Sequence, residues 1–194
     1  MRVIAGSLRG KILSSIQGDA VRPTSDKIRG AIFSALSSRL GTFQGRRFLD
    51  MFAGSGALSI EALSRGAAFA VLVDTSSSSL ELVRKNLAAC KLTQNFHIVR
   101  GNVLAVLDKI RPRGPYDVVF VDPPYGKGLA LQALELLSRE DLLQDEAWIV
   151  VETGREEPLP DALGPLQRSH TRDYGGTTIH YYCFHLAHEG HLND

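Results

Sequence analysis

Four consecutive residues, Asp122-Pro-Pro-Tyr125, follow an apolar run and are suited to holding an amine. The prolines Pro123 and Pro124 lack amide donors and stiffen the backbone, which leaves the carbonyls of Asp122 and Pro123 free to face a substrate. An exocyclic amine of guanine or adenine is a poor nucleophile because its lone pair is delocalised into the ring. Two fixed acceptors can bind its two hydrogens and stabilise the positive charge that develops on nitrogen. The tetrapeptide therefore predicts a catalytic site for a base amine, with Tyr125 stacking on the extruded base.

A glycine loop, Phe48–Gly56, lies where a strand is expected to become a helix. Gly54 and Gly56 permit positive φ and a close approach of ligand to backbone. The dinucleotide fingerprint requires Gly or Ala where this chain has Ser59, and no Walker lysine follows. Asp50 would pair with an ammonium group and would repel a pyrophosphate. The loop thus fits S-adenosylmethionine better than NAD or ATP. Its expected cofactor contacts are Asp50, Phe52, Ala53, Gly54 and Gly56.

Two further polar positions follow the next strands and extend the expected cofactor site. Asp74, followed by Thr75, can accept hydrogen bonds from the ribose hydroxyls of an adenosine-bearing ligand. Asn102 can contact the adenine edge, with the amide of Val103 nearby. Helix capping explains Asp74 and Asn102 as well, and both readings stay open. Asp122 is expected to touch the cofactor as well as the substrate.

Strand-like and helix-like runs alternate after Gly45 and would position these residues. Strands are expected at Arg46–Phe52, Phe69–Asp74, Phe96–Arg100, Tyr116–Val121 and Ala147–Glu152. Helices are expected at Ala57–Arg65, Ser78–Lys91, Val103–Ile110 and Leu129–Arg139. The strands are apolar throughout, which is typical of a parallel sheet covered by helices on both faces. The pattern predicts an α/β fold with a doubly wound, mostly parallel sheet.

The two ends of the chain have a different pattern. Near the C-terminus, Gln167–Asp173 and Thr177–Leu186 flank Tyr174-Gly-Gly176 and predict a hairpin. By analogy with Rossmann-like class I methyltransferases, the last strand is expected to be antiparallel. Near the N-terminus, Arg2–Ala5 and Lys11–Ile16 predict a second, small β-hairpin, and Pro23-Thr-Ser25 opens a helix. We expect a basic hairpin extension at 1–22, a methyltransferase domain at 23–187 and a tail at 188–194.

Charge is distributed unevenly along the chain. The net charge is only +1, but residues 1–47 hold nine Lys or Arg and two acids, a net +7, and the rest carries −6. This polarity favours a phosphate-bearing partner at the N-terminal end, although clustered surface charges are the alternative. The candidate RNA-contact residues are Arg2, Arg9, Lys11, Arg22, Lys27 and Arg29.

Length and composition exclude several other classes of protein. The 194 residues correspond to about one domain, and no stretch reaches the roughly 18 apolar residues of a membrane span. Arg9 comes before any signal-peptide core can form, and two isolated cysteines fit a reduced compartment. His185, His188 and His191 are three residues apart, but no acid or cysteine accompanies them in a convincing arrangement. We expect a cytoplasmic monomer with no bound metal and no membrane contact.

The motifs together resemble the RsmD family of bacterial 16S ribosomal RNA guanine-N2 methyltransferases over nearly the whole chain. The matching pieces are Arg2-Val-Ile-Ala-Gly6 with Arg9-Gly10, Arg22-Pro-Thr-x-Asp-x-x-Arg29, Asp50–Gly66, Asp122–Tyr125 and Tyr174-Gly-Gly-Thr177. The first and last pieces are the most family-specific. Gly30 stands where the family pattern has Glu, and Ser59 where Gly is usual.

The resemblance implies S-adenosylmethionine as cofactor and an N-terminal segment that helps to grip ribosomal RNA. It implies methylation of the guanine called 966, in 16S RNA that is free or assembled in the 30S particle. The residues alone leave two alternatives: adenine-N6 methylation of DNA or RNA, and a noncatalytic RNA-binding module on the same scaffold.

Overall fold

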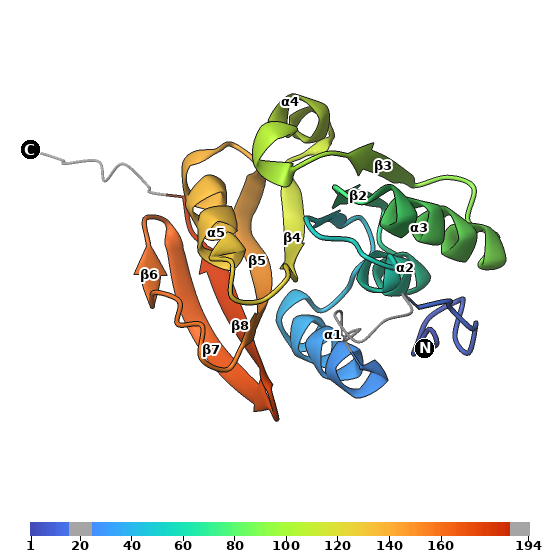
Figure 1. Cartoon of the computed structure of the whole chain (residues 1–194), viewed down its shortest axis with the longest axis horizontal. Coiled ribbons are helices and arrows are strands. Elements are labelled where there is room, and N and C mark those ends of the chain that lie inside the picture. Colours follow the sequence, from blue (N-terminus) through green and yellow to red (C-terminus); the bar gives the residue numbers. More distant parts are fainter. Residues whose placement is uncertain (16–24, 187–194) are drawn as a thin grey trace, which may run out of the picture.

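The computed structural model describes residues 1–15 and 25–186 and contains an eight-stranded sheet in the order β3-β2-β1-β4-β5-β8-β7-β6 (Figure 1). The strands are β1 Arg47–Asp50, β2 Phe69–Asp74, β3 Phe96–Arg100, β4 Tyr116–Val121, β5 Leu143–Gly154, β6 Ala162–Leu163, β7 Leu166–Tyr174 and β8 Thr177–Phe184. The helices are α1 Asp26–Leu40, α2 Ala57–Ser64, α3 Ser77–Ala89, α4 Leu107–Ile110 and α5 Leu129–Arg139, with single 3-10 turns η1 Val103–Ala105 and η2 Arg111–Arg113.

Helices cover both faces of the parallel part of the sheet. Strands β3, β2, β1, β4 and β5 pair in parallel. Alternate strand residues face opposite ways: Phe48 packs in one core with α1, α2 and α3, and Leu49 packs in the other with α4 and α5. The predicted doubly wound fold is confirmed. The carboxyl ends of these five strands lie at the same edge of the sheet, and the candidate residues lie there.

The end of the sheet is antiparallel, as expected, but more extensive than the sequence indicates. Strand β8 pairs antiparallel with β5 and with β7, and the short β6 adds a further antiparallel pair. The helix expected at Val103–Ile110 is wrong as one element, because Val106 has φ −110° and ψ 23° and separates η1 from α4. Two valines in this short run lower its helix propensity.

The N-terminal residues form the expected small hairpin in an irregular form, and it docks on α2. One antiparallel bridge joins Arg2 and Ile12, and the Val3 amide donates to the Lys11 carbonyl at 2.9 Å. The buried Glu61 carboxylate of α2 accepts hydrogen bonds from the amides of Ile4 (2.7 Å) and Ala5 (3.0 Å). Backbone donors that would form a ladder in a longer hairpin are thus satisfied by a side chain of the core.

The expected boundaries at residues 22 and 187 lie outside the described residues and remain predictions. Within residues 1–15 and 25–186, no helix combines the length and apolar character that crossing a membrane requires.

Candidate active site

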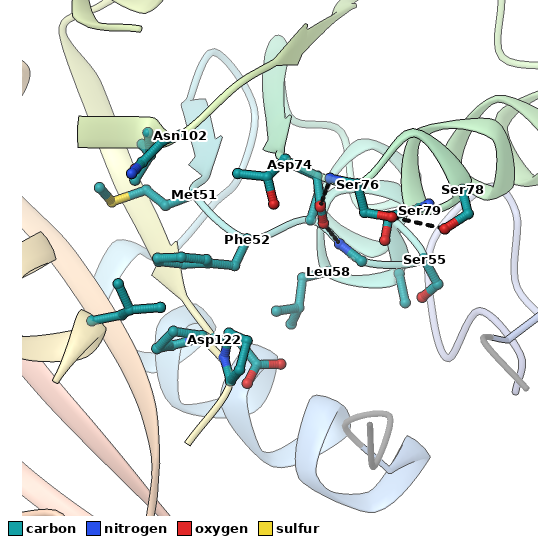
Figure 2. Close-up of a pocket in the computed structure, with 18 of the residues that line it drawn as sticks. Met51, Phe52, Ser55, Leu58, Asp74, Ser76, Ser78, Ser79, Asn102 and Asp122 are labelled. Carbon is teal, nitrogen blue, oxygen red and sulfur yellow. Dashed lines mark hydrogen bonds between the residues drawn. The ribbon is translucent and has the colours of Figure 1, made fainter. Parts of the chain in front are cut away.

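A cavity of about 650 Å³ opens where strands β1, β2, β3 and β4 end (Figure 2). The candidate residues that line it are Phe52, Ala53, Gly54, Asp74, Thr75, Asn102, Val103, Asp122, Pro123, Pro124 and Tyr125. These positions are far apart in the sequence, and the parallel sheet brings them to one edge. Most of the residues predicted to bind the cofactor and all four predicted catalytic residues therefore share one cavity.

Asp74 fixes the glycine loop to the end of β2. Its Oδ2 accepts a hydrogen bond from the Gly54 amide at 2.9 Å, and its Oδ1 accepts one from the Ser76 amide at 2.8 Å. A carboxylate has about four lone-pair positions, so both oxygens keep acceptor capacity toward the cavity. Figure 2 shows Asp74 between the serines of α3 and the part of the cavity that Asn102 borders. This position suits a residue that accepts from ligand hydroxyls.

Gly56 and Asp50 lie behind the cavity wall, and neither lines it. Gly56 has φ +77°, and a Cβ there would come within 3.3 Å of side chains of Leu72 and Val83. Gly56 is therefore needed for the close packing of the loop rather than for ligand contact. The expected ligand contacts of Asp50 and Gly56 are corrected accordingly.

Asp50 is 1% exposed, and its environment explains why it does not face a ligand. Its Oδ2 accepts a hydrogen bond from Ser59 Oγ at 2.9 Å, and its Oδ1 has no hydrogen-bond partner among the described residues. Burial raises the pKa of Asp50 to about 7, against the lowering effect of Ser59, and the nearby Asp74 raises it further. Ser59, which departs from the family pattern, is thus the hydrogen-bond donor to this buried acid.

Asn102 combines the two roles that the sequence left open. Its side-chain oxygen accepts a hydrogen bond from the Leu104 amide at 3.0 Å and so caps η1. The same side chain borders the cavity, as does Val103, which is only 2% exposed. The side-chain amide group of Asn102 remains the polar group at this end of the cavity (Figure 2).

The Asp122–Tyr125 loop lies beside the glycine loop because β4 pairs with β1. The Met51 amide donates to the Phe120 carbonyl at 3.0 Å and continues this pairing to the strand ends. Asp122 is half-buried, Pro123 is buried, and Tyr125 is 39% exposed. The Tyr125 hydroxyl donates to Glu152 Oε1 at 2.6 Å. Burial first, and this hydrogen bond second, raise the pKa of the Tyr125 phenol, so it stays protonated at neutral pH.

Several cavity residues escaped the sequence analysis. They are Met1, Met51, Ser55, Ala57, Leu58, Ser76, Ser78, Ser79, Gly101, Lys127 and Leu129. Lys127 follows Tyr125 by two residues, and this proximity could have identified it. Met1 reaches the cavity because the N-terminal segment docks on α2, which no sequence pattern indicates.

The candidate RNA-contact residues separate into two groups. Arg2, Arg9, Lys11 and Lys27 are exposed, and Arg22 lies outside the described residues. Arg29 is fully buried, and the expectation that it contacts RNA is wrong. Its Nη2 donates to the Arg2 carbonyl and to Asp26 Oδ1, and its Nε lies 3.8 Å from Glu61 Oε2. Arg29 therefore joins α1 and α2 to the N-terminal segment.

The described residues contain no group of three or more His, Cys, Asp or Glu side chains that could hold a metal ion. His185 is exposed, whereas His188 and His191 lie outside the described residues.

These features define a Rossmann-like methyltransferase: a doubly wound sheet with an antiparallel end, a glycine loop, an acid at the end of β2 and Asp-Pro-Pro-Tyr after β4. The family model described as conserved hypothetical protein 95 matches residues 1–183. The chain belongs to this family, the RsmD family.

Similar proteins agree with this assignment. Ribosomal RNA small subunit methyltransferase D of Escherichia coli (strain K12) is 39% identical over 82% of this chain and 78% of its own. YlbH of Bacillus subtilis (strain 168) is 36% identical over 94% of this chain and 98% of its own. The solved structure of yhhF from Escherichia coli is 35% identical, covers 95% of this chain and 98% of its own, and has a TM-score of 0.81.

Proposed function

We propose that the protein transfers a methyl group from S-adenosylmethionine to the exocyclic N2 amine of a guanine in 16S ribosomal RNA. By the family resemblance the target is the guanine called 966, in free RNA or in the 30S particle. The observation that carries the proposal is the position of Asp122 and Pro123 on the same cavity as Gly54 and Asp74. The name of the Escherichia coli relative supports small-subunit ribosomal RNA as the substrate.

The charges around the cavity fit this cofactor. The lining includes two acids, Asp74 and Asp122, and the base Lys127, and no phosphate-binding lysine follows the glycine loop. S-adenosylmethionine carries positive sulfonium and ammonium groups and no phosphate, so acids at the wall attract it. Asp74 would hold the ribose, and Asn102 with Val103 would hold the adenine. When bound, this cofactor supplies a methyl group activated by positively charged sulfur.

The chain's own groups bind and orient the target amine. The Asp122 carboxylate and the Pro123 carbonyl accept its two hydrogens, which favours tetrahedral nitrogen and stabilises the charge that grows there. Tyr125 stacks on the base and holds it out of its helix. No strong base is required, because the proton leaves after transfer. Positioning of amine and methyl group in one cavity supplies much of the rate.

The exposed basic residues extend the substrate surface. Arg2, Arg9, Lys11 and Lys27, together with Arg22, would contact RNA phosphates. Such contacts give affinity without base specificity, so the choice of nucleotide belongs to the cavity and to the RNA shape.

The proposal is tested by mapping methylated nucleosides by mass spectrometry in ribosomal RNA from cells that lack the gene, before and after the gene is restored. We expect one N2-methylguanosine of the small-subunit RNA to disappear and return. Methyl transfer to adenine of DNA or RNA instead would support the adenine alternative. Binding of RNA and cofactor without any transfer would support the noncatalytic module.

A further inference from the structure

The hairpin motif Tyr174-Gly-Gly-Thr177 has no part in the function proposed above, yet it lies at the active-site edge of the sheet. Thr177 begins β8 and pairs with Gly154, the last residue of β5. Tyr174 and Thr177 pair across the turn, where Gly175 has φ +65°. The turn therefore reaches the carboxyl end of β5, next to the loop that follows β4.

Tyr125 is the point where this hairpin meets the catalytic loop. Its hydroxyl donates to Glu152 Oε1 at 2.6 Å and lies 3.1 Å from Thr177 Oγ1. Glu152 is 5% exposed and Thr177 is 3% exposed, so both partners are fixed by the core. The Tyr125 ring lies over the backbone of Gly154, where even an added Cβ would be in ordinary van der Waals contact with the ring, 3.5 Å from Cδ2.

We infer that Glu152 and Thr177 are positioning residues that hold the Tyr125 ring as a pre-formed stacking platform for the target base. The inference rests on the proposed function, in which Tyr125 stacks on that base. Hydrogen bonds to a carboxylate are about twice as strong as those between neutral groups. A ring fixed before binding loses little conformational entropy when the base arrives. The exposed part of Tyr125 remains open for stacking.

This arrangement also restricts what Tyr125 can do chemically. Its proton is donated to Glu152, so the hydroxyl is committed to the protein and not to the base. The aromatic ring is the part left for the substrate, and it can stack on any of the four bases. The Tyr-Gly-Gly-Thr turn thereby gains a role, because it carries the Thr177 hydroxyl to this point.

The test is a double-mutant cycle of Tyr125→Phe and Glu152→Ala, read both as kcat/KM for small-subunit RNA and as the RNA dissociation constant. Each single variant should lower kcat/KM about tenfold, as loss of a charge-assisted hydrogen bond does. The double variant should be no worse than either single one, because Glu152 acts through the Tyr125 hydroxyl. Glu152→Gln, which keeps an acceptor, should restore activity to within about threefold, and the dissociation constant for S-adenosylmethionine should not change.

Thr177→Val removes the hydroxyl at constant shape and is the second variant if Glu152→Ala fails to fold. Its matched control is Thr178→Val, because the hydroxyl of the buried Thr178 donates to Asp173 in the same hairpin. The inference would be overturned if the losses of kcat/KM in the two single variants added up in the double variant, or if Thr177→Val and Thr178→Val lost equally. Neither outcome would affect the proposed function, because the wild type would still transfer methyl groups. If the wild type transferred no methyl group, the proposed function would fail. The double-mutant cycle, read as RNA dissociation constants, would still show whether Glu152 acts through the Tyr125 hydroxyl.

Discussion

Asp50 and Asp74 end neighbouring strands, and their surroundings give them different roles. Asp50 is buried with Ser59 as its hydrogen-bond donor, whereas Asp74 reaches the cavity and holds two backbone amides. The same residue type thus supports the loop from behind in one case and faces the ligand in the other. Sequence alone placed both acids in the ligand site, because strand ends are visible in a sequence and burial of a single side chain is not.

The raised pKa of Asp50 predicts a pH-dependent contribution to stability. Its pKa is about 7 in the folded chain against an ordinary 3.8, so the folded state holds the proton more tightly. The stabilisation is present below about pH 4 and is lost as pH rises toward 7. Asp50→Asn mimics the neutral acid and should gain about 2–3 kcal/mol in unfolding free energy relative to wild type between pH 5 and pH 8.

Urea unfolding of both proteins at the two pH values measures this difference, with the exposed Asp108→Asn as control. The difference in unfolding free energy between Asp50→Asn and wild type should therefore depend on pH. An equal difference at pH 5 and pH 8 would show that Asp50 is already ionised at pH 5 in the folded protein.

Asp74→Ala should weaken cofactor binding at least about tenfold, because the Gly54 amide and the ligand hydroxyls lose a charged acceptor. Isothermal titration with S-adenosylmethionine measures the dissociation constant. Asp108→Ala, which removes an exposed acid outside the cavity, is the matched control and should bind nearly as wild type does. An unchanged constant for Asp74→Ala would remove Asp74 from the site.

At the level of elements, the N-terminal segment is positioned by its fit against α2. A Cβ on Gly6, at φ +83°, would lie 1.9 Å from the Ser64 carbonyl oxygen, whereas a Cβ on Gly10, at φ +84°, would meet nothing within 4 Å. Gly6→Ala should therefore lower the unfolding free energy by about 2–4 kcal/mol through strain and clash together. Gly10→Ala should cost only about 1–2 kcal/mol, the cost of the backbone conformation.

Chemical denaturation of the two glycine variants measures the contrast, and Gly6→Ala should also weaken RNA binding more than Gly10→Ala does. Equal losses in the two variants would mean that the segment is not held by this contact.

The elements that the sequence predicted well are those with strong periodicity. Apolar runs identified β2, β3 and β4 at their observed bounds. The helix expected to open at Pro23-Thr-Ser25 is α1, and Ser25 caps it. The split at Val106 and the absence of strands in residues 1–15 were not predictable, because long-range contacts decide them. Glu61 illustrates this point, since its buried carboxylate replaces a strand partner for Ile4 and Ala5.

At the level of the whole molecule, the positive N-terminal end predicts salt-dependent RNA binding. Neutralising Arg9 and Lys11 together (Arg9→Gln with Lys11→Gln) should reduce the slope of log affinity against log salt by about 1–2. Both residues are exposed. Filter binding of small-subunit RNA between low and physiological salt gives the slope.

The exposed Arg84→Gln, from the acidic remainder of the chain, is the control for the loss of a positive charge. A slope that falls equally in this control would refute an RNA face at the N-terminal end. Arg29 shows that the number of basic residues in a segment does not identify the ones that contact RNA. Its position in a basic segment suggested an RNA contact, but its burial beside Glu61 and Asp26 gives it a structural role.

The central claim is that the oxygens of Asp122 and Pro123 hold the target amine beside the cofactor cavity. Its most direct test is methyl transfer from labelled S-adenosylmethionine to small-subunit RNA by wild type and by Asp122→Ala, with the cofactor dissociation constant measured on the same samples. We predict that the variant loses at least about a hundredfold in kcat, as removal of one such electrostatic partner does, while cofactor affinity falls less than it does in Asp74→Ala. Near-normal turnover by Asp122→Ala would contradict the account.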